Sequence, residues 1–253
     1  MIGIVGGIGP YSGLDLLKKV FDNTLASSDQ EHLDAVMLSA SSKIKDRTEY
    51  LIGKINENPA YAIAEVLLKL QATGATVAGI PCNTAHSERI FRVIQLELKK
   101  ENSTIKVLHM IEETVAFTVA NFPKITKVGV LSTTGTYKSG IYPQLLKSKG
   151  YEVIIPSLEM QEQLIHPAIY HPTYGIKSIS NPIHPQAREN LMQGISFFKE
   201  QGAQAVILGC TEIPLAITEP EVNTMVMIDP TNVLARALIQ NSAPDKLKPL
   251  KIS

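Results

Sequence analysis

Short apolar runs alternate with longer amphipathic stretches along most of the chain. The apolar runs fall at residues 1–6, 35–38, 77–80, 105–108, 128–131, 151–155, 205–208 and 225–228. Between these runs, apolar residues have the spacing of an amphipathic helix at residues 12–25, 59–72, 84–100, 110–122, 137–149, 181–202 and 229–240. Strands that alternate with helices in this way predict an α/β fold with parallel sheets.

The pattern occurs twice. Gly74 and Gly202 each begin a Gly-Ala pair, an apolar run follows, and a cysteine lies eight residues after the glycine. Cys82 and Cys210 are the only cysteines of the chain. Further upstream, Gly3, Gly9 and Tyr11 recur 126 positions later, while the two cysteines are 128 positions apart. Landmarks at nearly one displacement predict two similar α/β halves that face a central cleft.

These halves suggest the domain limits. We expect an N-terminal domain at residues 1–105 and a C-terminal domain at residues 106–220. The strand and helix of residues 221–242 have no counterpart in a strict two-copy scheme. We therefore expect them to cross back and complete the sheet of the first domain.

Charge and composition narrow the classes of function. The chain has 24 basic and 24 acidic residues, so it lacks the charge excess typical of nucleic-acid or anionic-membrane binding. The N-terminus shows neither a basic leader nor a cleavage site, and no apolar run approaches a membrane span, so a cytoplasmic location is expected. Two cysteines alone make a poor zinc site, and the histidines of residues 166–177 lack a nearby third ligand. We predict no metal, and a mobile or capping role for residues 166–177.

Each cysteine follows an apolar strand and precedes a polar pair, Asn83-Thr84 or Thr211-Glu212. Open α/β sheets place their chemistry at these strand ends. If the halves face each other, the two thiols lie on opposite sides of one cleft. Racemisation of a carbon acid needs a base on one face of the carbon and an acid on the other, and a thiolate with a thiol provides both. Two ordinary buried cysteines are the alternative.

Other candidate residues are open to two readings. The glycine-rich turn at residues 6–10, which includes Gly7, is either an anion cradle before a helix or a plain tight turn. Arg47 could bind a carboxylate in a fork or be a solvated surface group. His86 lies four residues after Cys82 and could tune the thiolate, although a structural role is favoured.

The chain resembles the aspartate/glutamate racemase family, and most closely its aspartate racemase branch. The matching motifs are CNTAH at residues 82–86, GCTE at 209–212, GGIGP at 6–10, DRT at 46–48 and STTGT at 132–136. The resemblance extends from residue 2 to about residue 240. It implies two pseudo-symmetric flavodoxin-like domains, no cofactor, a homodimer, and a two-base mechanism by Cys82 and Cys210.

The resemblance also implies a substrate site. Arg47 and Lys177 correspond to the family's active-site arginine and lysine, and cations of this kind would stabilise negative charge that builds as the α-proton leaves. Asn83, Thr84 and Thr211 would hold the α-carboxylate. Thr133 would line the cleft, as would Glu212 through the α-ammonium group.

Several functions remain open. Aspartate racemisation leads, followed by a glutamate or broader acidic amino-acid racemase, because Ser12-Gly13 stands where many relatives have Ala-Thr. An isomerase or decarboxylase of the same superfamily often lacks one cysteine. A two-domain amino-acid binding protein without catalysis is a different class, and it would give no reason for a thiol in each lobe.

Overall fold

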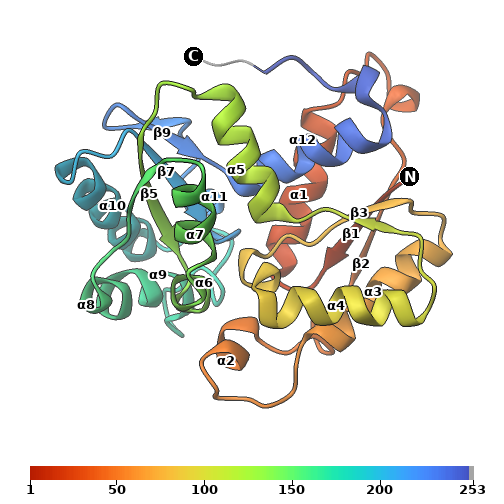
Figure 1. The fold of residues 1–253 in the computed structure, drawn as a ribbon, viewed down its shortest axis with the longest axis horizontal. Coiled ribbons are helices and arrows are strands. Elements are labelled where there is room, and N and C mark those ends of the chain that lie inside the picture. Colours follow the sequence, from red (N-terminus) through yellow and green to blue (C-terminus); the bar gives the residue numbers. More distant parts are fainter. Residues whose placement is uncertain (251–253) are drawn as a thin grey trace.

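The computed structural model describes residues 1–250, which form two α/β lobes (Figure 1). The first lobe has a four-stranded sheet in the order β2-β1-β3-β4, and the second a five-stranded sheet in the order β6-β5-β7-β9-β8. The strands are β1 Ile2–Gly6, β2 Ala35–Ser39, β3 Val77–Gly79, β4 Lys106–Val107, β5 Lys127–Ser132, β6 Glu152–Ile154, β7 Ala205–Gly209, β8 Glu221–Val222 and β9 Met225–Ile228. All neighbouring pairs are parallel except β8 with β9. The predicted α/β class with parallel sheets is confirmed.

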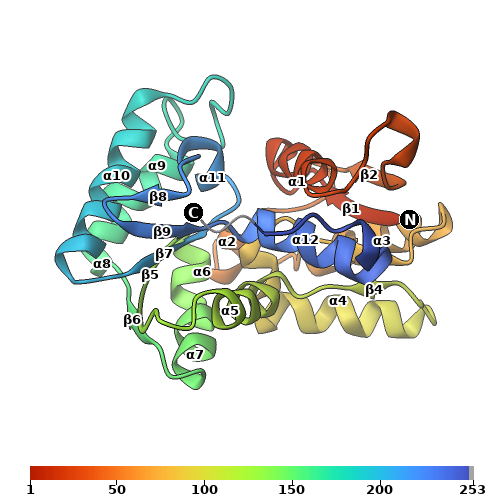
Figure 2. The ribbon, with the colours of Figure 1, turned by 90° about the horizontal axis from the view of Figure 1, so that it is seen from above.

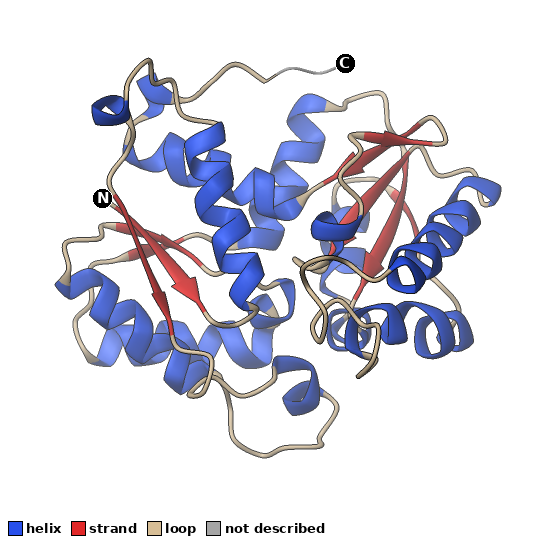
Figure 3. Cartoon of the chain, turned by 180° about the vertical axis from the view of Figure 1, so that it is seen from behind, coloured by secondary structure: helices blue, strands red, loops and turns tan. Residues whose placement is uncertain are grey.

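Helices flank both sheets, as the view from behind shows (Figure 3). The α-helices are α1 Pro10–Asp22, α2 Arg47–Leu51, α3 Ala60–Ala72, α4 Glu88–Lys100, α5 Met110–Asn121, α6 Thr134–Ser139, α7 Ile141–Ser148, α8 Leu158–Met160, α9 His166–Tyr170, α10 Pro185–Glu200, α11 Ile213–Ala216 and α12 Pro230–Ser242. Three short 3₁₀-helices, η1 Asp29–Glu31, η2 Asn83–His86 and η4 Pro244–Lys246, and one π-helix, η3 Gln161–Ile165, complete the description.

Two predicted helices are broken. The stretch at residues 84–100 divides into η2 and α4 because Ser87 has extended backbone angles (φ −62°, ψ 144°). The stretch at residues 137–149 divides at Gly140, whose φ of 66° belongs to the left-handed region that glycine tolerates. The second break is hidden because the apolar spacing of Tyr137, Ile141 and Leu145 continues across it.

The last strand lies in the second sheet, so the expectation that residues 221–242 complete the first sheet is wrong for this strand. β9 pairs with β7, with Ala205 opposite Val226. In the first sheet β4 occupies the same place beside β3, with Val77 opposite Lys106. The last strand therefore has a counterpart in β4. Strand β4 belongs to the first sheet, although residue 106 was expected to begin the second domain. With only two residues, β4 carries too short a pattern to show which sheet it joins.

The helices that follow these two strands are exchanged between the lobes. After β4, helix α5 packs Ile111 and Val115 into the core of the second lobe, beside Val128. After β9, helix α12 packs Leu234 and Leu238 into the core of the first lobe. The two helices contact each other and lie between the lobes (Figure 2). The chain thus crosses twice, and each lobe holds one helix of the other.

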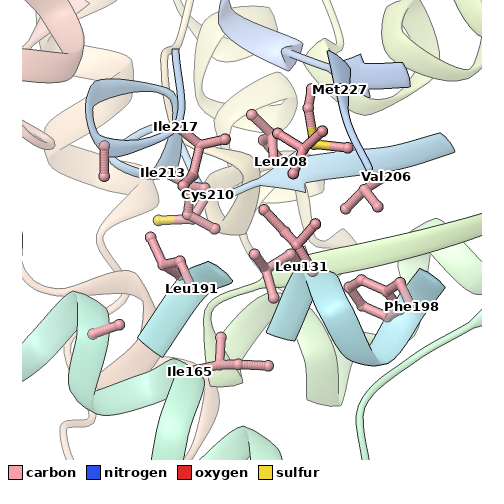
Figure 4. Packing of buried hydrophobic residues seen from close by; sticks show 14 of the residues in the cluster. Leu131, Ile165, Leu191, Phe198, Val206, Leu208, Cys210, Ile213, Ile217 and Met227 are labelled. Carbon is pink, nitrogen blue, oxygen red and sulfur yellow. The ribbon is translucent and has the colours of Figure 1, made fainter. Parts of the chain in front are cut away.

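Each lobe has a close-packed apolar core, and one of the two cysteines belongs to it. Cys82 belongs to the apolar cluster of the first lobe and Cys210 to that of the second, where it lies beside Ile213 (Figure 4). Within residues 1–250, no helix is both long and apolar enough to span a membrane. The same part of the chain has no group of three or more His, Cys, Asp or Glu side chains arranged to hold a metal ion.

Gly129 and Gly3 occupy corresponding positions in β5 and β1 but have different neighbours. A Cβ at Gly129 would lie 2.7 Å from Cγ of the buried Phe198 ring, whereas one at Gly3 would lie 3.1 Å from the small Ala75. We expect Gly129→Ala to lower the free energy of unfolding by about 1–3 kcal/mol, because a rigid ring in a dense core has little room to move. Urea unfolding measures this, with Gly3→Ala as the matched variant. An equal loss at both positions would contradict the prediction.

Candidate active site

The two cysteines are presented by the same backbone turn. Cys82 follows β3 and Cys210 follows β7. The amide of Cys82 donates to the carbonyl of Ile80 at 2.7 Å, and the amide of Cys210 donates to the carbonyl of Leu208 at 2.9 Å. The carbonyl of each cysteine accepts from the amide three residues later, at 3.2 and 3.0 Å. The repeat in the sequence therefore corresponds to a repeat in local geometry.

Both thiols line one enclosed cavity between the lobes. Its lining residues are Arg47, Cys82, Asn83, Thr84, Thr133, Tyr170, Lys177, Cys210, Thr211 and Glu212. Of the eleven residues singled out in the sequence, only Gly7 and His86 are missing from this lining. Gly7 lines an outer chamber of about 270 Å³ that shares Arg47, Lys177 and Glu212 with the cavity. The cavity itself measures about 10 Å³, room for one water at most, so its walls must move apart before an amino acid can enter.

Hydrogen bonds across the cavity hold the lobes together. The Thr84 hydroxyl of the first lobe lies 3.0 Å from the Thr133 hydroxyl and 2.9 Å from the Thr136 hydroxyl of the second. Thr211 donates to the carbonyl of Pro81 at 3.1 Å. Since every one of these partners is buried, the contacts belong to a closed arrangement of the two lobes.

Asn83 is oriented by a tyrosine that the sequence analysis did not single out. The hydroxyl of Tyr142, on α7, donates to Oδ1 of Asn83 at 2.6 Å. Burial raises the pKa of Tyr142 well above its usual range, so this hydroxyl keeps its proton. The bond leaves Nδ2 of Asn83 buried and without a hydrogen-bond partner within residues 1–250. An amide N–H fixed in this way is a ready donor to a carboxylate.

Glu212 connects Cys210 to Lys177. Its Oε1 accepts from Nζ of Lys177 at 2.5 Å, and its Oε2 lies 3.0 Å from Sγ of Cys210. Burial alone would raise the pKa of Glu212, but Lys177 and the Cys210 thiol hold that pKa below its usual value. Burial first, and the Glu212 carboxylate second, raise the pKa of Cys210 well above the ordinary thiol value. Cys210 is therefore a protonated thiol that donates to a carboxylate.

Arg47 is buried, with only 5% of its surface exposed, so the reading of a solvated surface arginine does not hold. It begins helix α2, which Asp46 caps, and its guanidinium donates to the carbonyls of Ile8 and Lys45. Burial opposes its charge, but neighbouring Cys82, Asp46 and Tyr170 raise the pKa of Arg47 above its usual value. Its Nε has no hydrogen-bond partner in the described chain. A permanent cation with a free donor thus lies beside Cys82.

Residues 166–177 cover the cavity. Helix α9 carries Tyr170, whose hydroxyl donates to the Thr48 hydroxyl at 3.0 Å, and Nζ of Lys177 lies 5.5 Å from the centroid of the Tyr170 ring. Ile169 and Ile176 are fully buried and anchor the segment. Of its two predicted roles, capping fits this placement. Sequence reasoning missed Tyr170 because one tyrosine in an aromatic segment carries no motif of its own.

Gly7 and His86 have structural contacts. Gly7 has a φ of +82°, and a Cβ there would lie 2.5 Å from the amide nitrogen of Ser41, so the glycine allows two backbones to approach. Nδ1 of His86 lies 2.9 Å from the carbonyl of Cys82. Burial, aided by nearby His109, lowers the pKa of His86 to about 3, so its ring is neutral. The structural role favoured for His86 agrees with this contact.

Two α/β lobes close over a polar cavity, and each contributes a thiol to its lining. This arrangement is typical of a protein that binds a small molecule between its lobes. The chain belongs to the Asp/Glu/Hydantoin racemase family, whose model matches residues 5–238. The family that the motifs indicated is confirmed, and the protein is a racemase-family isomerase by class.

Similar proteins cover almost the whole chain. The broad specificity amino-acid racemase RacX of Bacillus subtilis (strain 168) is 28% identical over 245 residues, which is 94% of this chain and 96% of that protein. The structure of Picrophilus torridus aspartate racemase is 28% identical, with a TM-score of 0.78 and coverage of 99% of this chain and 95% of that one. The glutamate racemase of Francisella tularensis in complex with D-glutamate is 20% identical with a TM-score of 0.62, over 99% and 84% of the chains, and shows a shared fold.

Proposed function

We propose that this protein is an amino-acid racemase that needs no cofactor and inverts the α-carbon with Cys82 and Cys210, and that aspartate is its leading substrate. The observation that carries the proposal is the placement of both thiols, from matching turns of the two lobes, in the lining of one closed cavity. A carbon held between them has one sulfur on each face, which is what inversion by two bases requires.

The electrostatics suggest a starting state. Cys210 is protonated and donates to Glu212, so it is the acid at the outset. Cys82, beside the buried Arg47, is then the base. In one direction the Cys82 thiolate takes the α-proton of the substrate. The Cα–H bond breaks and leaves its electron pair on the α-carbon. The Cys210 thiol gives its proton to the opposite face, and the enzyme ends with a Cys82 thiol and a Cys210 thiolate. The reverse direction restores the first state.

The cavity lining offers partners for each charged group of the substrate. Nδ2 of Asn83 is suited to the α-carboxylate, as is the Thr211 hydroxyl once its bond to the Pro81 carbonyl breaks, and Glu212 is suited to the α-ammonium. With Cys82 as the starting thiolate, Arg47 and Lys177 balance the charges of Cys82 and Glu212 in the cavity lining. Once Cys82 takes up the α-proton, the two cations outnumber Glu212 by one, and preorganised cations of this kind stabilise charge on the developing carbanion. The unpartnered Nε of Arg47 is suited to a second carboxylate on the substrate.

Broad specificity is the second candidate. Lys177 already pairs with Glu212 at 2.5 Å, so a distal carboxylate would compete with an existing partner. The outer chamber of about 270 Å³ also leaves space for side chains longer than that of aspartate. The relative named a broad specificity amino-acid racemase is consistent with this alternative. A homodimer and a cytoplasmic location stay predictions.

The test is exchange of the α-proton in D₂O, without added pyridoxal phosphate. L- and D-aspartate, both glutamate enantiomers and a panel of neutral and basic amino acids are followed by NMR and chiral chromatography. We expect aspartate to exchange and invert fastest. Faster inversion of a longer or uncharged amino acid would establish the broad-specificity alternative. Binding of an amino acid with no exchange at all would favour the non-catalytic binding protein.

A further inference from the structure

A chain of hydrogen bonds leads from the exchanged helix α5 to Cys82. The amide of Glu112, in the first turn of α5, donates to Nδ1 of His109, which caps the helix, at 3.2 Å. Nε2 of His109 lies 3.1 Å from the carbonyl of His86. Nδ1 of His86 in turn lies 2.9 Å from the carbonyl of Cys82. Two histidines thus connect a helix terminus to the residue proposed as the base.

The direction of each bond follows from the partners. Nδ1 of His109 accepts the Glu112 N–H, so the proton of the neutral ring is on Nε2 and is donated to the carbonyl of His86. A carbonyl only accepts, so Nδ1 of His86 carries the proton that is donated to Cys82. The remaining nitrogen, Nε2 of His86, is then a lone pair, consistent with its lack of a partner in the described residues.

Aromatic packing holds both rings in place. The His86 ring stacks on Phe91 with centroids 5.1 Å apart, and the His109 ring meets the edge of Phe91 at 4.6 Å. His86 is fully buried, and so is Ile111, which follows the cap by two residues and packs in the core of the second lobe. The bonded chain therefore joins Cys82 to the start of a helix that packs Met110 into the first lobe and Ile111 into the second.

We propose that His86 and His109 are positioning residues that tie the turn carrying Cys82 to helix α5, so that closure of the lobes places this thiol for proton transfer. The proposal rests on the proposed function, in which Cys82 exchanges a proton with substrate. The turn η2 has four residues, and its Asn83 and Thr84 side chains bond to the second lobe. His86 instead bonds the backbone carbonyl of Cys82 itself. The second lobe has no corresponding histidine pair after Cys210, where Thr211 and Glu212 make the local contacts.

Substitution by asparagine or glutamine tests this role at residues 86 and 109. The substitution that keeps the hydrogen bond at one position should lose it at the other. Asn replaces the Nδ1 end of histidine and Gln the Nε2 end. At residue 86, Asn keeps the donor to Cys82 and Gln loses it. At residue 109, Gln keeps the donor to His86 whereas Asn keeps only the helix cap.

We expect His86→Gln and His109→Asn to lower kcat for α-proton exchange by about 10- to 100-fold with KM within about twofold, because a thiol displaced by about 1 Å transfers protons poorly. His86→Asn and His109→Gln should stay within about threefold of the wild type in kcat. Thermal unfolding of all four variants provides the control for general damage. Equal kcat for Asn and Gln at each position, or losses that follow the drop in Tm, would overturn the proposal.

A second readout does not depend on turnover. Peptide mass spectrometry measures the rate at which iodoacetamide alkylates Cys82 separately from that of Cys210. The Cys82 rate should change severalfold in His86→Gln and His109→Asn. It should hardly change in His86→Asn and His109→Gln. If the wild type exchanges no amino acid, the proposed function fails, and this alkylation pattern alone decides the positioning role. An unchanged rate in all four variants would refute that role.

Discussion

Replacing Cys210 by serine is expected to slow inversion of the substrate by about 10³-fold or more, while exchange of one enantiomer continues. Serine keeps the shape of the residue, but its hydroxyl is far too weak an acid to replace the thiol at neutral pH. Cys82 can still remove the α-proton that faces it and return a deuteron to the same face. One enantiomer should therefore gain deuterium in D₂O without changing configuration.

The Cys82→Ser variant is the matched control. It should also lose inversion, and the other enantiomer should continue to exchange, but more slowly, because the raised pKa of Cys210 leaves little of it as thiolate. NMR of the α-proton with chiral chromatography separates exchange from inversion. If either single variant still inverts within about tenfold of the wild type, or if both exchange the same enantiomer, the two-base mechanism is wrong.

The second large effect concerns stability, at the ion pair between Lys177 and Glu212. The Glu212 side chain is 6% exposed and the pair distance is 2.5 Å. Lys177→Met should lower the free energy of unfolding by about 3–5 kcal/mol at neutral pH, because it leaves a buried carboxylate without its cation. The double variant Lys177→Met with Glu212→Gln removes both charges and should recover much of the loss, which a double-mutant cycle in urea measures.

The pH dependence of this loss has a definite sign. In the wild type the pKa of Glu212 is held below its usual value, chiefly by Lys177 against the opposing effect of burial. The pair therefore contributes stability above the unfolded carboxyl value of about 4.3 and loses it as the pH falls through the lower folded value. In Lys177→Met burial dominates and raises that pKa, so Glu212 takes up a proton more easily. The deficit should be largest near pH 7 and shrink toward pH 5. A deficit that grows as the pH falls would contradict this account.

Local pattern was enough to single out the two cysteines that line the cavity. Cys82 and Cys210 stand out because a glycine, an apolar run and a polar pair recur around each, and strand ends meet at one edge of a parallel sheet. The neighbouring Asn83, Thr84 and Thr211 follow from adjacency to the cysteines. Lys177 came only from the family resemblance, since its segment breaks the α/β pattern.

Contacts between distant segments were beyond the sequence. Tyr142 and Tyr170 reach the cavity from α7 and α9, and no spacing relates them to the cysteines. The closure of the cavity to about 10 Å³ depends on side chains from both lobes at once. The pairing of β9 with β7 depends on which sheet edge is available. Strand β4 is too short for its sequence to show which sheet it joins.

The sequence by itself determined the type of each main element, the twofold repeat and the position of one thiol after a strand in each half, because periodicity and strand-end residues are local properties of the chain. Only the tertiary structure decided that β9 joins the second sheet, that α5 and α12 exchange lobes, and that His109 reaches Cys82 through His86. These features arise from packing between segments far apart in sequence, and such packing is selected by the shape and burial of whole surfaces rather than by any local pattern.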